Sequence, residues 1–298
     1  MPYLSRTRLG AVCFTALLLP LSGCFRSTRA VVLTHAPSTV LDATLTELLK
    51  QTDQRYNQIQ TMNASIDIAV STGGGREGKV VDYSAFPGYL LLRKPGDLRV
   101  LLFTPVGHVQ AIDMVTDGKT FTMHIPPRNR AITGSNALST PSKNPLENLR
   151  PAVFFDSLLI KGPSPDDLVS QTSDERVYQP DPTRKAVFDE PEYDLSIFHQ
   201  VAGSPELKVQ RVVHIGRATL LPYQQDIYDE KGRLATVASY EAYQKFGDLR
   251  FPSVITISRP VDQLRLKLTI RKLNTNQPLE DDQFQLKLPA NTQIQKLP

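Results

Sequence analysis

The chain has 298 residues, with 34 basic and 30 acidic side chains and a formal charge of +4 at neutral pH. This near-even balance gives no argument for a nucleic-acid partner. The two cysteines, Cys13 and Cys24, both lie near the N-terminus. The rest of the chain therefore has no disulfide and must fold on its apolar core, for which it is long enough.

Residues 1–23 have the features of a cleaved export signal. Arg6 and Arg8 form a short positive segment, and the run at 9–21 is dominated by apolar and small residues. That run is too short for a membrane-spanning helix, which needs about 20 apolar residues, but it suits a signal peptide. Loss of the two arginines with the signal lowers the formal charge to +2.

The signal ends in a lipid-attachment motif. Leu21, Ser22, Gly23 and Cys24 match the lipobox of bacterial lipoprotein signals. The match implies that the Cys24 thiol carries a lipid and that the chain is cut just before it, where two small residues leave the backbone accessible. The alternative is an ordinary secretory signal with a cysteine there by chance. We expect acyl chains such as palmitate to anchor the mature protein without a membrane span.

The residues after Cys24 indicate the location of the anchored protein. Phe25 stands where an inner-membrane retention signal carries aspartate, so the periplasmic face of the outer membrane is expected. Residues 24–38 show no clear hydrophobic period and predict a tether. Residues 39–298 are expected to form a single domain, because neither a shift in composition nor a repeat divides them.

One amphipathic helix is predicted at the start of this domain, over about 40–59. Thr39 is expected to cap it, with Asp42 three residues later in a pattern close to a capping box. Mostly apolar side chains then recur at steps of three and four residues, as the buried face of a helix requires. The residues on that face are Leu41, Leu45, Leu48, Thr52, Tyr56 and Ile59.

After the helix the hydrophobic period changes to two, which is typical of β-strands. The clearest case is Leu264–Ile270, where apolar and polar residues alternate strictly. Asp117-Gly118 and Lys231-Gly232 predict hairpin turns. Further strands are predicted near 66–70, 79–93, 97–103, 108–116, 120–125, 192–199, 207–215, 222–229, 233–243 and 251–258.

Three segments depart from this pattern. Residues 136–160 predict a loop followed by a short apolar helix that begins at Pro151, since proline is tolerated in the first turn. Residues 162–174 predict a polar loop, and Glu280-Asp281-Asp282 predicts a solvated turn before a last strand.

These elements predict a mainly β fold of the α+β kind. It consists of a long antiparallel sheet of about 11 strands, and such a wide open sheet must curl. A helix across its concave side encloses either a packed core or a ligand cavity, and periodicity does not distinguish the two.

An ordered set of short motifs extends along the chain from about 40 to 290. Its members are Tyr56–Ile59, Met62–Ala64, Gly88–Pro95, Leu98–Val100, Thr104–Gly107, Val115–Gly118, Ile125–Arg130, Phe251–Pro252, Asn274 and Phe284–Pro289. In their order and spacing these stretches resemble the LolA/LolB-like lipoprotein-carrier superfamily. The resemblance implies a curved antiparallel half-barrel with a helical lid over an apolar concavity.

The resemblance also implies a function. A LolB-type protein binds acyl chains of lipoproteins or lipids for outer-membrane lipoprotein sorting, and can exchange cargo with a periplasmic carrier protein. In such receptors an apolar residue on a protruding loop inserts into the membrane. Pro105, Val106 and Gly107 form the corresponding stretch, which assigns that role to Val106. The alternative is a plain β-turn with proline at its second position.

The sequence predicts no enzyme, no metal site and no cofactor. Gly73-Gly74-Gly75 lacks the lysine and hydroxyl residue that complete a phosphate loop, and no G-x-S-x-G motif is present. The histidines include no pair at helical metal-ligand spacing. They are His35, His108, His124, His199 and His214.

Two functions are compatible with these expectations. The first is a monomeric carrier driven by apolar burial, which contributes about 25 cal/mol per Å². The second is a structural or interaction lipoprotein with a filled barrel, docked onto an envelope assembly complex. Residues expected to line a lipid cavity could equally be plain core; they are Leu45, Leu48, Leu49, Ile66, Ile68, Leu264, Leu266 and Leu268.

Overall fold

The computed structural model describes residues 34–35, 37, 39–74, 77–136, 151–179, 183 and 186–297. The predicted signal peptide, its lipobox with Cys24, most of the tether and the loop before Pro151 lie outside the described residues. The chain divides into two compact units. The smaller contains the segment Val177–Asp189 and β1 (Thr34–His35), which pairs in parallel with the first residues of β9.

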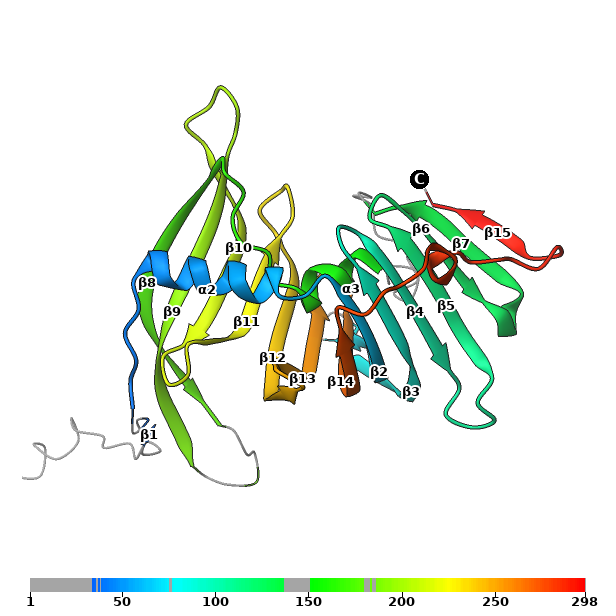
Figure 1. Cartoon of the computed structure of the whole chain (residues 1–298), viewed down its shortest axis with the longest axis horizontal. Helices are drawn as coiled ribbons and strands as arrows, with labels where there is room; N and C mark the ends of the chain where they lie inside the picture. Colours follow the sequence, from blue (N-terminus) through cyan, green and yellow to red (C-terminus); the bar gives the residue numbers. More distant parts are fainter. Residues whose placement is uncertain are drawn as a thin grey trace, which may run out of the picture. The chain divides into compact units, whose positions relative to one another are not determined.

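The larger unit contains Pro37–Arg176 and Glu190–Pro298 and is built on one open sheet (Figure 1). Hydrogen-bonded neighbours follow the order β9-β10-β11-β12-β13-β14-β2-β3-β4-β5-β6-β7-β15, with β8 beside β9. The strands are β2 (Thr61–Gly74), β3 (Lys79–Arg93), β4 (Asp97–Phe103), β5 (Gln110–Asp117), β6 (Thr120–Ile125), β7 (Arg130–Ser135), β8 (Asp167–Tyr178), β9 (Val187–Gln200), β10 (Leu207–Gly216), β11 (Leu221–Tyr228), β12 (Leu234–Phe246), β13 (Leu249–Arg259), β14 (Leu264–Thr275) and β15 (Gln293–Lys296).

The predicted fold class is confirmed. The neighbours from β9 to β7 along this path pair antiparallel, while β15 joins β7 in parallel. Two α-helices, α2 (Leu45–Asn57) and α3 (Pro151–Leu158), accompany the sheet within the described chain. The estimate of about 11 strands was too low, because the fourteen strands from β2 to β15 include short or polar ones that lack a clear apolar alternation.

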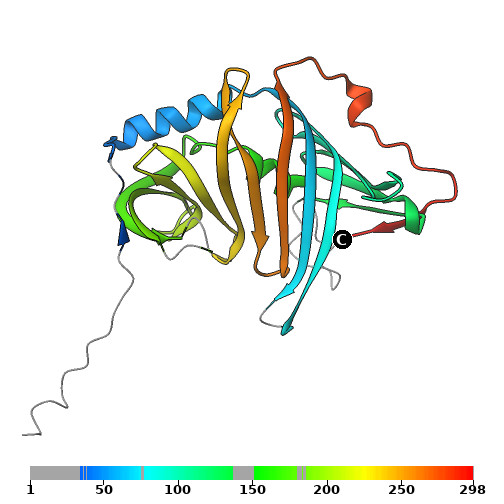
Figure 2. The same cartoon turned by 90° about the horizontal axis from the view of Figure 1, so that it is seen from below.

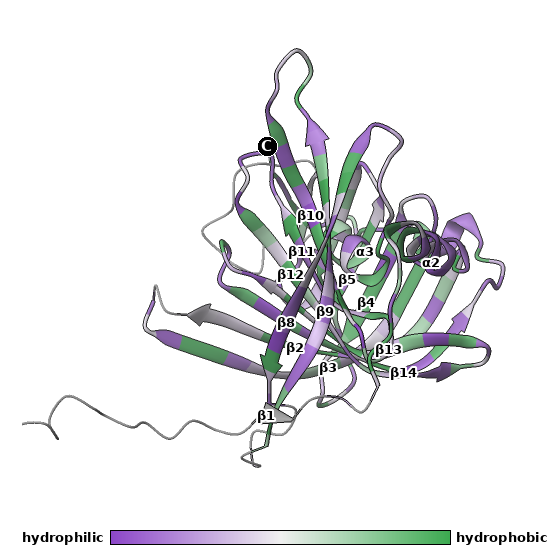
Figure 3. Cartoon of the chain, turned by 90° about the vertical axis from the view of Figure 1, so that its left-hand side faces the viewer, coloured by the Kyte–Doolittle hydropathy of each residue, from purple (hydrophilic) through white to green (hydrophobic). Residues whose placement is uncertain are grey.

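Alternation along the central strands creates the core. Hydrophobic and hydrophilic residues alternate along several of the strands in Figure 3. On β14, Leu266 and Leu268 pair with Val70 and Ile68 of β2, and all four side chains are buried on the same face. The register therefore places the apolar rows of neighbouring strands side by side, as the period of two requires.

Helix α3 covers this buried face. Its Phe154 is fully buried, and Leu158 and Leu159 are nearly so, within the cluster that contains the central strands. The helix contacts β4, β5 and β13. In a flat sheet β5 and β13 would lie about 24 Å apart, whereas eight helical residues span only about 12 Å. The sheet must therefore curve toward α3, as its strands do in Figure 2.

Helix α2 begins later than predicted. Thr44 caps it: its hydroxyl accepts a hydrogen bond from the Glu47 amide, and the Glu47 carboxylate accepts one from the Thr44 amide. The expected cap at Thr39 is wrong, because Asp42 instead forms an ion pair with Arg217. Leu48 of α2 packs in a second, smaller apolar cluster with residues of β9 and β10.

Two further expectations are corrected. The segment predicted as a polar loop at 162–174 contributes most of β8, whose residues are largely exposed and so carry no hydrophobic signal. The acidic run at 280–282 leads into a short 3₁₀ helix, Asp281–Phe284, rather than directly into a strand. The last strand is β15, which starts nine residues after that helix.

Replacing Phe154 by alanine tests the role of α3. The substitution leaves a cavity under the curved sheet, and we expect the free energy of unfolding to fall by about 3–5 kcal/mol. Urea denaturation followed by circular dichroism measures the change. Leu168→Ala, at a position that is 49% exposed on β8, serves as a control and should cost less than about 0.5 kcal/mol. Equal effects of the two substitutions would contradict this role.

Candidate functional site

An apolar pocket lies where α2, the residues after α3 and the strands β10 to β13 meet. Its volume is about 50 Å³. Thr52, Tyr56 and Ile59 line it from α2 and its C-terminal end, at the steps of four and three residues that place side chains on one face of a helix. The remaining lining residues are Arg55, Leu158, Leu159, Ile160, Val213, Pro222, Tyr240, Tyr243, Leu249, Arg250, Phe251 and Pro252.

The two tyrosines of β12 have their hydroxyl groups fixed by backbone carbonyls. The Tyr240 hydroxyl donates to the Ser157 carbonyl of α3 at 2.9 Å, and the Tyr243 hydroxyl donates to the Pro222 carbonyl at 2.7 Å. Burial raises the pKa of both phenols, so both remain neutral at physiological pH. They therefore contribute ring surface to the pocket and no charge.

Two arginines supply the charge at this pocket. Arg55 of α2 donates to the Leu220 carbonyl at 2.8 Å and to the Gln51 side-chain oxygen at 3.1 Å. Burial lowers the pKa of Arg55; Tyr243 opposes that shift, and the like charge of Arg250 adds to it. Neither arginine forms an ion pair with any described residue. The pocket thus combines an apolar lining with unneutralised positive charge.

The residues predicted to line a lipid cavity fall into two groups. Ile66, Ile68, Leu264, Leu266 and Leu268 are buried in the main core, which also contains Phe154 of α3. Leu48, together with the partly buried Leu45 and Leu49, belongs to the cluster under α2. The structure does not bring these groups together, and none of the eight residues lines the pocket. Their role in binding stays a prediction.

The predicted insertion loop is a tight β4–β5 connection with an apolar tip. The Val106 side chain is 86% exposed. Thr104 holds the loop from one side: its hydroxyl donates to the Val106 carbonyl at 2.7 Å and accepts from the Val109 amide at 3.1 Å. Gly107 adopts φ +79°, a conformation that favours glycine. The loop therefore presents Val106 outward on a fixed backbone.

Aromatic side chains extend the exposed apolar surface from this loop. His108 stacks on Phe103, with ring centroids 4.5 Å apart, and Phe103 in turn meets Tyr89 edge to face. Tyr89 is 51% exposed and Val109 is 59% exposed. We call Tyr89, Phe103, Val106, His108 and Val109 the loop patch.

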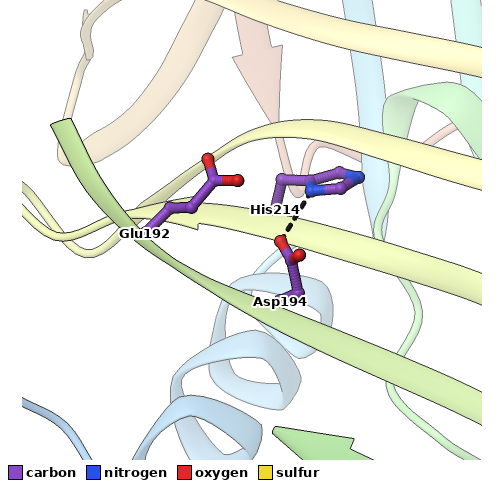
Figure 4. Close-up of side chains that lie close together, drawn as sticks. All are labelled: Glu192, Asp194 and His214. Atoms are coloured by element: carbon purple, nitrogen blue, oxygen red, sulfur yellow. Dashed lines mark hydrogen bonds and ion pairs between the residues drawn. The ribbon is translucent and has the colours of Figure 1, made fainter. Parts of the chain in front are cut away.

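A polar cluster occupies the sheet between β9 and β11. Glu192 and Asp194 of β9 lie beside His214 of β10, with one potential ligand atom of each within 4.8 Å of the others (Figure 4). The His214 Nδ1 is 2.7 Å from Asp194, and its Nε2 is 3.6 Å from Asp226 of β11. These residues could supply metal ligands, but the Nδ1 contact already provides the imidazole with a carboxylate partner. Because they come from different strands, no local motif in the sequence reveals them.

The cluster favours a protonated histidine. Burial acts to lower the pKa of His214, but the negative charges of Asp226 and Asp194, with the hydrogen bond to Asp194, outweigh it, and the pKa is raised. Burial likewise raises the pKa of Glu192, against the hydrogen bond that the Tyr223 hydroxyl donates to it. Protonated His214, on β10, therefore attracts one carboxylate on each neighbouring strand, Asp194 of β9 and Asp226 of β11.

Comparison with known proteins identifies the fold. No protein-family model matches the sequence, and no curated protein matches it. The structure is similar to that of an outer-membrane lipoprotein-sorting protein domain from Vibrio parahaemolyticus, with a TM-score of 0.50 and 12% identity, over 80% of this chain and 94% of that one. A LolA superfamily protein from Nitrosomonas europaea gives a TM-score of 0.49 at 14% identity, over 82% and 99%.

The similarity to the Vibrio domain shows a shared fold, and to that extent the resemblance inferred from the sequence is confirmed. Among the described residues, no helix has both the length and the apolar character needed to cross a bilayer.

The His214 cluster predicts a dependence of stability on pH. Because folding raises the pKa of His214, its stabilising effect is complete below the ordinary value of about 6.5 and is lost as pH rises through the raised value. We expect His214→Gln to lower the thermal unfolding midpoint most at pH 5–6, with the difference from the wild type narrowing by pH 9. His108→Gln is the control, at an exposed histidine that forms no ion pair with a described residue. A deficit of His214→Gln that does not vary with pH would refute this account.

Proposed function

We propose that the protein is a lipid-anchored carrier or receptor that binds acyl chains of lipoproteins or lipids for outer-membrane lipoprotein sorting, in the manner of a LolB-type protein. The observation that carries the proposal is the apolar pocket beneath α2, set beside the core of a curved sheet. The fold shared with a lipoprotein-sorting domain supports it. An apolar pocket with few directed polar groups selects a ligand by the shape of its acyl chain rather than by a reactive group. The proposed function is therefore not enzymatic.

Binding requires the pocket to open. A volume of about 50 Å³ is far below the roughly 300–1,000 Å³ of typical ligand sites. Of the two helices that border the pocket, α2 is the more weakly held, since only Leu48 and Thr52 are buried on it. The shorter α3 buries four residues, including Phe154 in the main core. We infer that α2 is the lid and that α3 remains in place.

The loop patch serves as the membrane contact in this proposal. Val106 and Val109 are exposed aliphatic side chains, and the Tyr89 ring has an apolar body with a polar tip, which suits a membrane interface. With Cys24 lipidated, the tether at 24–38 keeps the domain near the periplasmic face of the outer membrane.

Uptake of an apolar dye tests the carrier function. Chain expressed without its signal and with Cys24→Ala is titrated with N-phenyl-1-naphthylamine, a neutral probe whose fluorescence rises in apolar sites. We expect saturable binding that palmitate displaces. Val213→Phe, which fills the pocket from β10, should weaken it at least tenfold, whereas Val237→Phe, at a half-buried position on β12 outside the pocket, should not.

Absence of saturable binding would reject the carrier and favour the alternative, a structural lipoprotein with a filled core that docks onto an envelope assembly complex. Thermal unfolding of both valine variants shows whether a loss of binding reflects the pocket or a loss of fold, since overpacking costs about 1–3 kcal/mol.

Membrane insertion of the loop predicts an effect of Val106→Glu. A carboxylate at this exposed tip leaves the fold intact but resists burial in lipid. We expect binding of the Cys24→Ala chain to outer-membrane lipid vesicles, measured by co-sedimentation, to fall at least fivefold. The matched control is Val80→Glu, at a valine that is 58% exposed near the start of β3. Unchanged sedimentation of Val106→Glu would leave the loop as a plain turn.

A further inference from the structure

We propose that the pocket takes an anionic amphiphile, with an acyl chain in the apolar part and a carboxylate or phosphate group held by Arg55 and Arg250. This inference rests on the proposed carrier function and specifies the chemical class of its cargo. Both arginines line the pocket, one from α2 and the other from β13.

The first argument is the lack of a counter-ion. The ionisable groups that act on Arg55 are Tyr243 and Arg250, and no carboxylate is among them. Asp156 of α3, which acts on two tyrosines of the pocket, lies instead within the fields of Arg211 and Lys161. Two like charges therefore act on one another at the lining of the pocket, one on the half-buried Arg55 and the other on the exposed Arg250.

The second argument is the state of the guanidinium groups themselves. Arg55 is half-buried, and burial together with the charge of Arg250 disfavours its protonated form. A buried charge without a partner is costly, so proteins pair such groups or use them to bind an ion. Arg55 uses neutral oxygens of Leu220 and Gln51, which fix its direction without neutralising it. An anionic group at this point would relieve both the desolvation and the mutual repulsion.

The third argument is the contrast between the charge and the surrounding surface. Most other lining residues are apolar, and the hydroxyl groups of both β12 tyrosines donate to backbone carbonyls. A small anion would leave this surface uncovered, and a neutral chain would leave the arginines unpaired. A long chain that ends in an acid satisfies both parts, and guanidinium groups bind both carboxylate and phosphate by charge-assisted hydrogen bonds.

Three ligands of equal chain length separate these contributions. Palmitate, hexadecyl phosphate and hexadecanol each displace N-phenyl-1-naphthylamine from the full mature chain carrying Cys24→Ala. We expect the wild type to bind one or both acids about tenfold more tightly than the alcohol. The relative affinities of palmitate and hexadecyl phosphate show whether a carboxylate or a phosphate is the better head group.

The arginine variants assign the preference to the pocket. Arg250→Gln removes an exposed side chain and should reduce the preference for acids. Arg55→Gln with Arg250→Gln should abolish it, so that palmitate and hexadecyl phosphate bind no more tightly than hexadecanol. Arg265→Gln, at an exposed arginine of β14 outside the pocket, should leave the preference unchanged. Thermal unfolding of the double variant shows whether a lost preference reflects the missing charges or a loss of fold.

The outcomes distinguish this inference from the carrier function. If none of the three ligands displaces the dye, the proposed carrier function fails and the inference fails with it. If the acids and the alcohol bind equally to the wild type, the carrier stands and the anionic cargo is wrong. If the preference for acids survives in the double variant, the charge that produces it lies elsewhere and Arg55 and Arg250 are not the head-group site.

Discussion

Burial of the sheet's apolar face against α3 is the constraint on which the rest of the larger unit depends. An eight-residue helix is too short to cover six flat strands, so the strands from β13 to β5 curve toward Phe154, Leu158 and Leu159. In the part of the chain that the structure describes, α3 occupies the middle of this curve. The rows that alternate most cleanly in the sequence, on β2 and β14, are core for this reason.

Beside α3, apolar side chains line the pocket instead of filling the main core. Helix α2 covers β9 and β10 through a small cluster around Leu48, and its C-terminal end meets Leu158–Ile160 at the pocket. Because α2 contributes little to the main core, it can move at a lower cost than α3. The same helix carries Arg55, so the element proposed as the lid also carries one of the two charges proposed to select the cargo.

Much of the fold was predictable because its physical signals are local. Period-two alternation identified eleven of the strands, Pro151 marked the start of α3, and two glycine turns marked hairpins. β7, β8 and β15 were missed: β8 and β15 are largely exposed, and on β7 the two buried residues are adjacent, so none of the three shows that alternation. The start of α2 was misplaced because Thr44 with Glu47 forms a better capping box than Thr39 with Asp42. The pocket was not predictable, because its lining comes from six separate segments of the chain. Periodicity shows which residues are apolar, but the position of α3 decides which of them line a pocket.

The central claim is that α2 is a lid beside a core fixed by α3. Hydrogen–deuterium exchange of the Cys24→Ala chain, read by mass spectrometry with and without palmitate, tests it most directly. The account predicts that α2 amides exchange through local opening in the unliganded protein and become several-fold slower when palmitate is bound. The α3 amides should exchange only with global unfolding in both states. Equal protection of the two helices, with no response of α2 to palmitate, would contradict the account.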